Sequence, residues 1–156
     1  DTHGTPFRRA IEEELIDTSR SSQIGLRGPL YDLEDYQMST EEGLLAITGP
    51  ELHKIGNQKA VEMIKERIGD GPAYLTFDID FIDPAFAPGT GTPEAGGFTG
   101  YDGIEIIRGL TDISFIGYDM VEVMPPYDPA DITSLLAANI MYEFISLIAI
   151  EKQKSE

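Results

Sequence analysis

The sequence predicts an α/β protein with a mostly parallel sheet. The order of its elements predicts the sheet type, and its length and composition predict a compact unit. Helical and strand-like patterns alternate along the chain, in the order helix, strand, helix, strand, helix, strand, helix. This order is typical of crossover connections between parallel strands. The chain has 156 residues, of which 41% are hydrophobic, and this suits one compact domain or one half of a larger one.

The first elements are a helix and a short strand. Thr5 followed by Pro6 is typical of a helix start, and the apolar residues of 6–16 then fall mainly on one side. Residues 22–26 (SQIGL) are a strand candidate. The segment 39–48 (STEEGLLAIT) begins like a helix and ends apolar, so both helix and strand stay open for it.

The middle of the chain predicts a helix, a strand and a long loop. Gly49-Pro50 punctuates the chain, and residues 57–69 (NQKAVEMIKERIG) predict a helix closed by a glycine. Residues 73–80 (AYLTFDID) have the aromatic and β-compatible composition of a strand. The long loop extends from residue 84 to residue 100.

The last third predicts a helix, a strand and a long final helix. The helix covers residues 101–110 and the strand covers residues 114–124 (SFIGYDMVEVM). The final helix begins at Asp128-Pro129 and extends to residue 152. Parallel sheets bind ligands at the carboxyl ends of their strands, and acidic residues gather at two of these ends.

Composition excludes several classes of function. The formal charge of −17 argues against nucleic-acid and anionic-membrane partners, which both need a basic surface. The absence of cysteine excludes disulfides, zinc–thiolate sites and thiol nucleophiles. No apolar run approaches the roughly 20 residues that span a bilayer. No signal peptide is visible, and we expect a cytoplasmic protein without nucleic-acid or membrane partners.

Three aspartates stand at the end of the strand 73–80, where a buried parallel strand should be apolar. Successive strand residues point to opposite faces, so Asp78 and Asp80 should point the same way. Two such carboxylates repel each other unless a cation lies between them. Oxygen ligands favour magnesium, calcium or manganese, and added imidazoles would favour manganese. Asp83, before Pro84, should cap a turn or support the metal ligands.

Other interpretations of the aspartates differ in how well the spacing fits. An EF-hand loop that begins at Asp78 needs glycine at its sixth position and glutamate at its twelfth, but the chain has Asp83 and Gly89 there. A phosphatase of the aspartyl-nucleophile type usually has threonine or valine where Ile82 stands. A glycosyltransferase DxD motif stays open, and so does a set of plain loop and capping residues.

Three longer segments carry a resemblance to a known family. Residues 75–99 (LTFDIDFIDPAFAPGTGTPEAGGFT), 3–17 (HGTPFRRAIEEELID) and 117–133 (GYDMVEVMPPYDPADIT) resemble the ureohydrolase (arginase/agmatinase) family, in the family's order. The resemblance implies a three-layer α/β/α sandwich, of which residues 1–156 would be the C-terminal portion, incomplete at the N-terminal side. It also implies a homo-oligomer, a trimer or a hexamer.

The resemblance implies a reaction as well. Family members hydrolyse a guanidinium group to urea and an amine, with two manganese ions that share a bridging hydroxide. The motifs HGTPF and VEVMPPYD are closer to agmatinases and guanidino-acid hydrolases than to arginase. The substrate expected first is agmatine, a small cationic guanidino compound. Guanidinobutyrate or another guanidino acid stays open, and so does a non-catalytic ureohydrolase-like subunit.

The site residues follow from the resemblance, motif by motif. Asp78 and Asp80 would be metal ligands, and Glu122 would bind the guanidinium, whose paired N–H groups fit a carboxylate. His3 would shuttle a proton to the leaving amine, for which its ordinary pKa near 6.5 is suited. Thr92, in a loop that also contains Thr90, would lie beside the metals and the substrate.

The sequence departs from the family pattern in its metal ligands. It has two histidines and lacks the family motifs GGDH and DAHxD, so the remaining manganese ligands are expected upstream of this chain. Whether Asp1 is the last aspartate of the second motif stays open. Arg27 lies where relatives line the substrate entrance, but its spacing suggests no role. His53 matches no ligand motif, and we expect an ordinary surface histidine.

Overall fold

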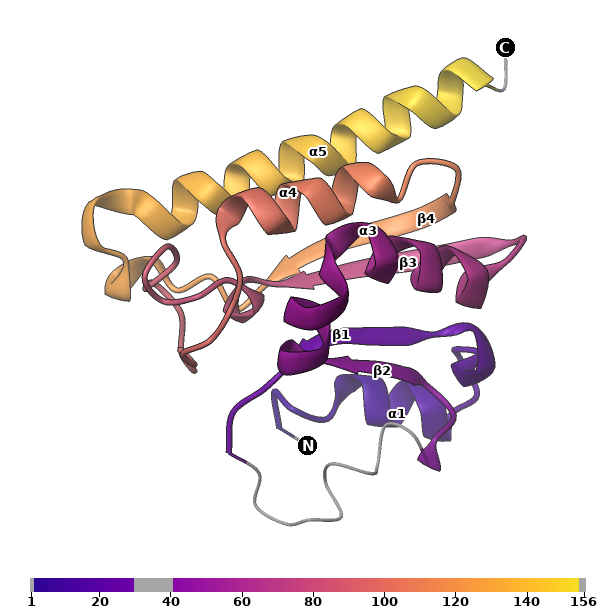
Figure 1. Cartoon of the computed structure of the whole chain (residues 1–156), viewed down its shortest axis with the longest axis horizontal. Helices are drawn as coiled ribbons and strands as arrows, with labels where there is room; N and C mark the ends of the chain where they lie inside the picture. The colour runs from indigo at the N-terminus through magenta and orange to yellow at the C-terminus, as the bar shows by residue number, and fades with distance from the viewer. Residues whose placement is uncertain (1, 30–40, 155–156) are drawn as a thin grey trace.

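The computed structural model describes residues 2–29 and 41–154. From residue 49 onward helices and strands alternate along the chain, as the sequence predicts, whereas the two strands before it follow one another among the described residues (Figure 1). The main elements are, in chain order, α1 (Pro6–Glu12), β1 (Ser22–Leu26), β2 (Leu45–Thr48), α3 (Gly49–Ile68), β3 (Pro72–Asp78), α4 (Gly100–Gly109), β4 (Ser114–Val121) and α5 (Ile132–Lys154). Short 3-10 turns are η1 (Thr18–Arg20), η2 (Ile79–Phe81), η3 (Pro125–Tyr127) and η4 (Pro129–Asp131).

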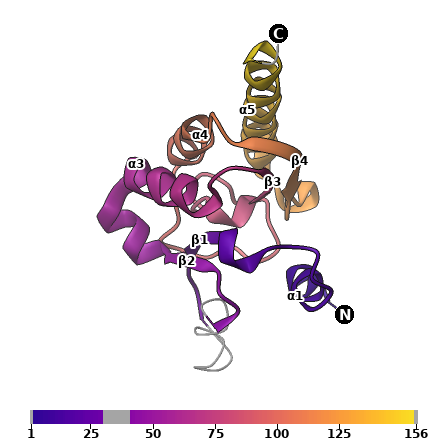
Figure 2. The same cartoon turned by 90° about the vertical axis from the view of Figure 1, so that its right-hand side faces the viewer.

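The strands pair in parallel, which confirms the predicted sheet type. β1 pairs with β2, and β3 pairs with β4; within the described residues these pairs are two separate two-stranded sheets. Helices α3 and α4 lie on one side of the strands and α1 lies on the other (Figure 2). Helix α5 runs along α4 and also contacts β4 (Figure 1).

The core is formed by isoleucine, leucine and phenylalanine side chains from the strand ends and the three long helices. Its most completely buried members are Leu52, Ile79, Ile82, Ile107 and Ile140. Two of these, Ile79 and Ile82, are the first residue of the η2 turn after β3 and the residue that follows this turn. The packing of these two side chains in the core therefore fixes the backbone that carries the aspartates.

Helix α3 begins eight residues earlier than predicted. Thr48 and Glu51 form a capping box, with the Glu51 carboxylate accepting the Thr48 N–H at 2.9 Å. Pro50 lies in the first turn, where its missing N–H costs no hydrogen bond. The helix then continues through a kink at Gly56, which has a φ of 78°. Gly49-Pro50 is therefore a helix start and not only a break.

The N-terminal helix is shorter than predicted. Helix α1 ends at Glu12, and the chain turns at Glu14, which has a φ of 55°. The side chains of Phe7 and Leu15 are exposed, so the expected apolar stripe of residues 6–16 does not pack against the core.

The segment 39–48, for which both helix and strand stayed open, forms a strand over Leu45–Thr48. Its first two residues lie outside the described part of the chain.

Helix α5 is more apolar than the sequence suggested. Against expectation, residues Pro129–Lys154 are long and apolar enough to cross a membrane by length and composition. An 18-residue stretch within them has a mean hydropathy of 1.6, and 28% of that stretch is buried. The core helix of a soluble protein meets the same criterion. Here one face of α5 packs into the core through Ala137, Ile140, Phe144 and Leu147.

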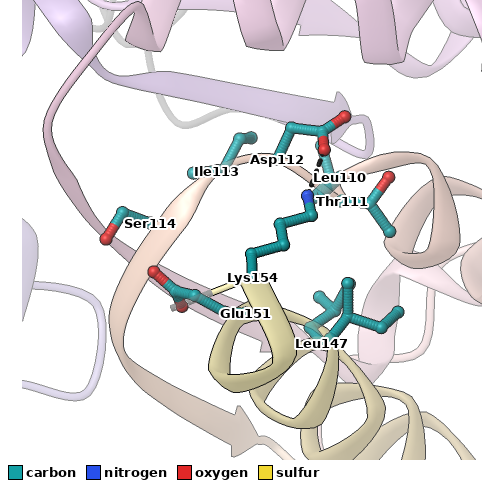
Figure 3. A pocket seen from close by; sticks show the side chains of 9 residues that line it. Leu110, Thr111, Asp112, Ile113, Ser114, Leu147, Glu151 and Lys154 are labelled. Atoms are coloured by element: carbon teal, nitrogen blue, oxygen red, sulfur yellow. Dashed lines mark hydrogen bonds and ion pairs between the residues drawn. The ribbon is translucent and has the colours of Figure 1, made fainter. Parts of the chain in front are cut away.

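The far end of α5 is tied to the loop after α4. Lys154 donates a hydrogen bond to Asp112 beside a hollow of about 280 Å³ (Figure 3). Lys65 of α3 adds a second contact to Asp112 at 3.5 Å. The hydrogen bond from Lys154 lowers the pKa of Asp112. This hollow lies at the end of the β3–β4 pair opposite to Asp78, so it is separate from the aspartate-rich turn.

The start of α5 is fixed by Asp128, four residues before the helix. Its carboxylate accepts the N–H groups of Thr133 at 2.9 Å and Ser134 at 2.7 Å. Although burial raises the pKa of Asp128, these hydrogen bonds dominate and lower it to about 2. The predicted start at Asp128-Pro129 is displaced to Ile132, because the η4 turn intervenes with positive φ at Ala130 and Asp131.

We expect Asp128→Asn to lower the thermal midpoint at neutral pH, with a smaller effect in acid. The lowered pKa means that the charged carboxylate stabilises the fold above its unfolded pKa of 3.8. This stabilisation is lost as the pH falls from 3.8 towards about 2. Thermal unfolding from pH 7 to pH 2 checks this, with Asp131→Asn as control. A wild-type-to-variant difference that is the same at both ends of this range would contradict it.

Candidate active site

The carboxyl ends of β3 and β4 meet side by side. Asp78 ends β3, Val121 ends β4, and the two residues are partners in the parallel register. Glu122 follows immediately with a φ of 61°, a left-handed conformation that is uncommon for residues other than glycine. Such conformations concentrate at functional sites, where surrounding structure holds them. The prediction that acidic residues gather at these strand ends is confirmed.

Asp78 and Asp80 lie close together, but the strand alternation that predicted this is wrong. β3 ends at Asp78, and Asp80 lies in the η2 turn. The Asp80 N–H donates to the Asp78 Oδ1 atom at 2.8 Å, so Asp78 caps the turn that carries Asp80. The pair therefore depends on a tight turn rather than on the pleat of a longer strand.

The charge of Asp78 is disfavoured in this setting. The residue is open to solvent on one side, yet burial of its carboxyl group among protein atoms raises its pKa to about 6. The N–H of Asp80 opposes this shift, and repulsion from the carboxylates of Asp80 and Glu122 adds to it. A cation beside Asp78 would reverse the effect, because it favours the charged form.

The loop of residues 84–97 returns to the aspartates through two threonines. The hydroxyl groups of Thr90 and Thr92 donate to the two carboxylate oxygens of Asp80. Thr90 is buried, and its hydroxyl oxygen also lies 2.9 Å from the Glu122 carbonyl, so its single proton is shared between this carbonyl and Asp80. Thr92 is exposed. Thr92 therefore lies beside a predicted metal ligand. Its contact with substrate stays a prediction.

His3 lies near Glu122 although the two are far apart in sequence. Its Nδ1 atom is 3.9 Å from the Glu122 Oε1 atom, and 76% of the histidine side chain is exposed. This distance suits an ion pair when the imidazole is protonated. The structure thus brings together the two residues that were assigned to guanidinium binding and proton transfer.

The described residues supply only part of a metal site. Asp78 and Asp80 offer carboxylate oxygens, which suit hard divalent cations. Within residues 2–29 and 41–154, no group of three or more His, Asp or Glu side chains could hold a metal ion by itself. Asp1, the open candidate for a further ligand, lies outside the described residues.

Two residues have contacts that sequence reasoning missed. The Arg27 guanidinium donates to the backbone carbonyls of Asp80 and Glu94, although only the position of Arg27 had been noted. His53 is exposed as expected, but its ring stacks on Phe98 at 4.2 Å. No local pattern reveals such contacts, because their partners lie more than forty residues away in sequence.

Asp83 caps the loop, which is one of the two roles that the sequence predicted for it. Its carboxylate accepts the N–H of Ala85 at 2.9 Å and those of Gly96 and Gly97 at 2.9 and 3.0 Å. Led by the hydrogen bond from Ala85, these contacts lower the pKa of Asp83. Asp83 therefore joins the beginning of the loop to its end.

Comparison with known proteins identifies the family. The family model described as the arginase family matches residues 1–146. The chain belongs to the arginase family. Membership of this family implies a metal cofactor in general, which agrees with the paired carboxylates. The predicted family resemblance is therefore confirmed.

Individual arginase-family relatives extend this result. The chain is 49% identical over 146 residues to a guanidinobutyrase from Pseudomonas aeruginosa, covering 94% of this chain and 46% of that protein. It is 45% identical over 150 residues to an agmatinase from Neisseria meningitidis, covering 96% of this chain and 46% of that protein. A crystal structure of a hypothetical agmatinase from Burkholderia thailandensis matches with a TM-score of 0.88 and 40% sequence identity. The match covers 99% of this chain and 46% of that one.

The arginase-like α/β fold class is confirmed by this structural similarity. The chain spans about half the length of the relatives that it matches. Their names describe hydrolases of guanidino compounds.

Proposed function

We propose that the protein hydrolyses a guanidino compound to urea and an amine in a metal-dependent reaction, with agmatine as the first candidate substrate. The observation that carries the proposal is the convergence of Asp78, Asp80, Glu122 and His3, from separate parts of the chain, at one edge of the β3–β4 pair. The similarity to a guanidinobutyrase and an agmatinase supports the same reaction class.

Glu122 would bind and orient the substrate. A planar guanidinium can donate two parallel N–H groups to its carboxylate. The Glu122 backbone is left-handed, and its carbonyl lies 2.9 Å from the Thr90 hydroxyl, which also contacts Asp80. His3, 3.9 Å from the Glu122 carboxylate, would give a proton to the leaving amine. In this proposal Glu122 would recognise the guanidinium and His3 would transfer the proton.

We propose manganese as the metal, held in part by Asp78 and Asp80. When bound, the metal ions would supply an activated water near neutral pH. Thr90 and Thr92 would hold the Asp80 carboxylate in one orientation, which is the task of groups that bond to metal ligands. Two aspartates cannot complete a two-metal site, so the remaining ligands would come from a part of the natural protein that precedes Asp1. The present chain would then be the C-terminal portion of a single ureohydrolase domain.

A second candidate substrate is guanidinobutyrate, favoured by the 49% identity to a guanidinobutyrase. The two substrates differ in charge at the end remote from the guanidinium. A groove of about 600 Å³ opens between the ends of β1 and β3, and its charged lining residues are Arg27, Asp78, Asp80 and Glu94. Of these described residues, Asp78 and Asp80 are the proposed metal ligands, and Arg27 donates to backbone carbonyls. Glu94 is left to meet the remote end of a substrate and would suit the amine of agmatine, so agmatine remains the first candidate.

Urea release tests the proposal. The natural full-length protein, loaded with manganese, would be assayed on agmatine, guanidinobutyrate, guanidinopropionate and arginine. We expect turnover of at least one guanidino compound, with the highest kcat/KM on agmatine. A preference for guanidinobutyrate would transfer the proposal to that substrate. No turnover on any of the four would instead support a non-catalytic subunit.

We also propose a cytoplasmic homo-oligomer, a trimer or a hexamer, without nucleic-acid or membrane partners. The oligomeric state follows from the family resemblance, and the exclusion of nucleic-acid and membrane partners follows from the charge of −17. Light scattering on the full-length protein would measure the oligomeric state, and a monomer would contradict this part of the proposal.

A further inference from the structure

The Arg27 side chain connects three separate backbone segments at the candidate site. Its Nη2 atom donates to the carbonyl of Asp80 and, at 2.9 Å, to that of Glu94. Its Nε atom donates to the same Glu94 carbonyl at 3.2 Å, and Nη1 lies 3.4 Å from the Gly25 carbonyl. Hydrogen bonds from a charged donor are stronger than neutral ones. One side chain thus ties the end of β1 to the η2 turn and to the loop 84–97.

The surrounding backbone is packed closely against this guanidinium. A Cβ atom at Gly97 would lie 2.6 Å from the Arg27 Nη2 atom and 2.6 Å from the Asp83 nitrogen. Glycine is therefore required where the end of the loop passes between Arg27 and Asp83. Such a close fit leaves little freedom for Arg27 to adopt another position while the loop stays in place.

The two threonines of the loop are held in different ways. Thr90 is buried, and the Glu122 carbonyl lies 2.9 Å from its hydroxyl oxygen as an alternative acceptor beside Asp80. Thr92 is exposed and lies two residues before Glu94, whose carbonyl Arg27 holds. Loss of Arg27 should therefore free the Thr92 hydroxyl from Asp80 before it disturbs Thr90.

We propose that Arg27 is a positioning residue for Asp80: it fastens the loop 84–97 to the end of β1 and thereby keeps the Thr92 hydroxyl on the Asp80 carboxylate. The effect on catalysis rests on the proposed function, whereas the effect on the loop does not. A planar guanidinium can reach the Asp80 and Glu94 carbonyls at once. A lysine ammonium, which is a single charged point, can replace this arrangement only in part.

A different role would be recognition of a substrate carboxylate at the groove. The contacts argue against this role, because the Arg27 nitrogen atoms already donate to backbone carbonyls. The two roles also predict different kinetics. A positioning residue acts on agmatine and guanidinobutyrate alike, mainly through kcat. A carboxylate-binding residue acts on the KM of guanidinobutyrate and leaves agmatine unchanged.

The kinetic test compares Arg27→Gln and Arg27→Lys in the natural full-length protein. Arg20→Gln is the matched control, because Arg20 also donates to backbone carbonyls, those of Ile68 at 2.7 Å and Asp70 at 2.6 Å, away from the site. We expect Arg27→Gln to lower kcat about tenfold or more on both substrates, since small displacements of reacting groups are costly. Arg27→Lys should recover part of this loss, and Arg20→Gln should leave kcat unchanged.

A double variant tests whether Arg27 acts through Thr92. If both residues orient the same carboxylate through one loop, Arg27→Gln should add little to the kcat loss of Thr92→Val. A kcat loss in the double variant equal to the product of the two single-variant losses would overturn the proposal. A loss in Arg27→Gln no larger than that in Arg20→Gln, or one confined to the KM of guanidinobutyrate, would also overturn it.

Hydrogen exchange provides a measurement that needs no turnover. In Arg27→Gln we expect faster amide exchange in residues 84–97 than in the wild type, with no such change there in Arg20→Gln. Unchanged exchange in this segment would overturn the proposal, whatever the activity. If the wild type hydrolyses no guanidino compound, the proposed function fails, while the exchange comparison still decides whether Arg27 holds the loop.

Discussion

Asp80→Asn is expected to remove bound metal and guanidino hydrolysis together. The substitution removes a negative charge that two threonine hydroxyls hold in place beside Asp78. Loss of groups that only support a metal ligand costs about 10–100-fold in metal affinity or activity, and loss of a ligand itself should cost at least the upper value. Elemental analysis after dialysis and urea release on the same sample would measure both quantities.

Asp112→Asn is the matched control for Asp80→Asn. It removes the same charge from an exposed aspartate at the opposite end of the β3–β4 pair, where the partners are Lys154 and Lys65. We expect it to lower stability slightly and to leave the metal content unchanged. Wild-type metal content in Asp80→Asn would contradict the assignment of Asp80 as a ligand.

Glu122→Gln is expected to retain metal but to bind the guanidino substrate more weakly. The amide keeps the shape of the side chain and removes the charge that pairs with the guanidinium. A hydrogen bond to a charged group contributes about 1.5–3 kcal/mol, which corresponds to a rise in KM or Kd of about 10–150-fold. The affinity can be measured by calorimetry with a guanidino ligand, and the metal content by elemental analysis.

Glu105→Gln gives the corresponding control on α4. Glu105 accepts hydrogen bonds from Asn57 and Tyr101, so its substitution tests a loss of glutamate charge away from the site. Its substrate affinity should equal that of the wild type. The same result for Glu122→Gln would remove Glu122 from the role of guanidinium binding.

The sequence predicts the order and parallel pairing of the elements well, because these depend on local periodicity and on general chain topology. Element ends are predicted less well. Gly49-Pro50 looked like a break, but a capping box at Thr48 makes it a helix start. β3 stops at Asp78 because that carboxylate captures the Asp80 N–H and begins a turn. Both ends depend on side-chain hydrogen bonds that hydrophobic patterns do not contain.

The candidate site divides in a similar way. Asp78 and Asp80 could be found from their unusual position after an apolar strand, and Glu122 and His3 from the motifs around them. The distance of 3.9 Å between His3 and Glu122 follows only from tertiary structure. The position of Arg27 was noted, but its contacts could not be predicted, since its acceptors are backbone carbonyls that carry no side-chain pattern.

The most direct test of the central claim is an anomalous-diffraction map of the natural full-length protein, from crystals soaked in manganese. The carboxylates of Asp78 and Asp80 should both contact an anomalous peak at the ends of β3 and η2. The opposite result would be two carboxylates that face bulk solvent, with no peak between them after the soak. That map would show that these aspartates do not hold a metal.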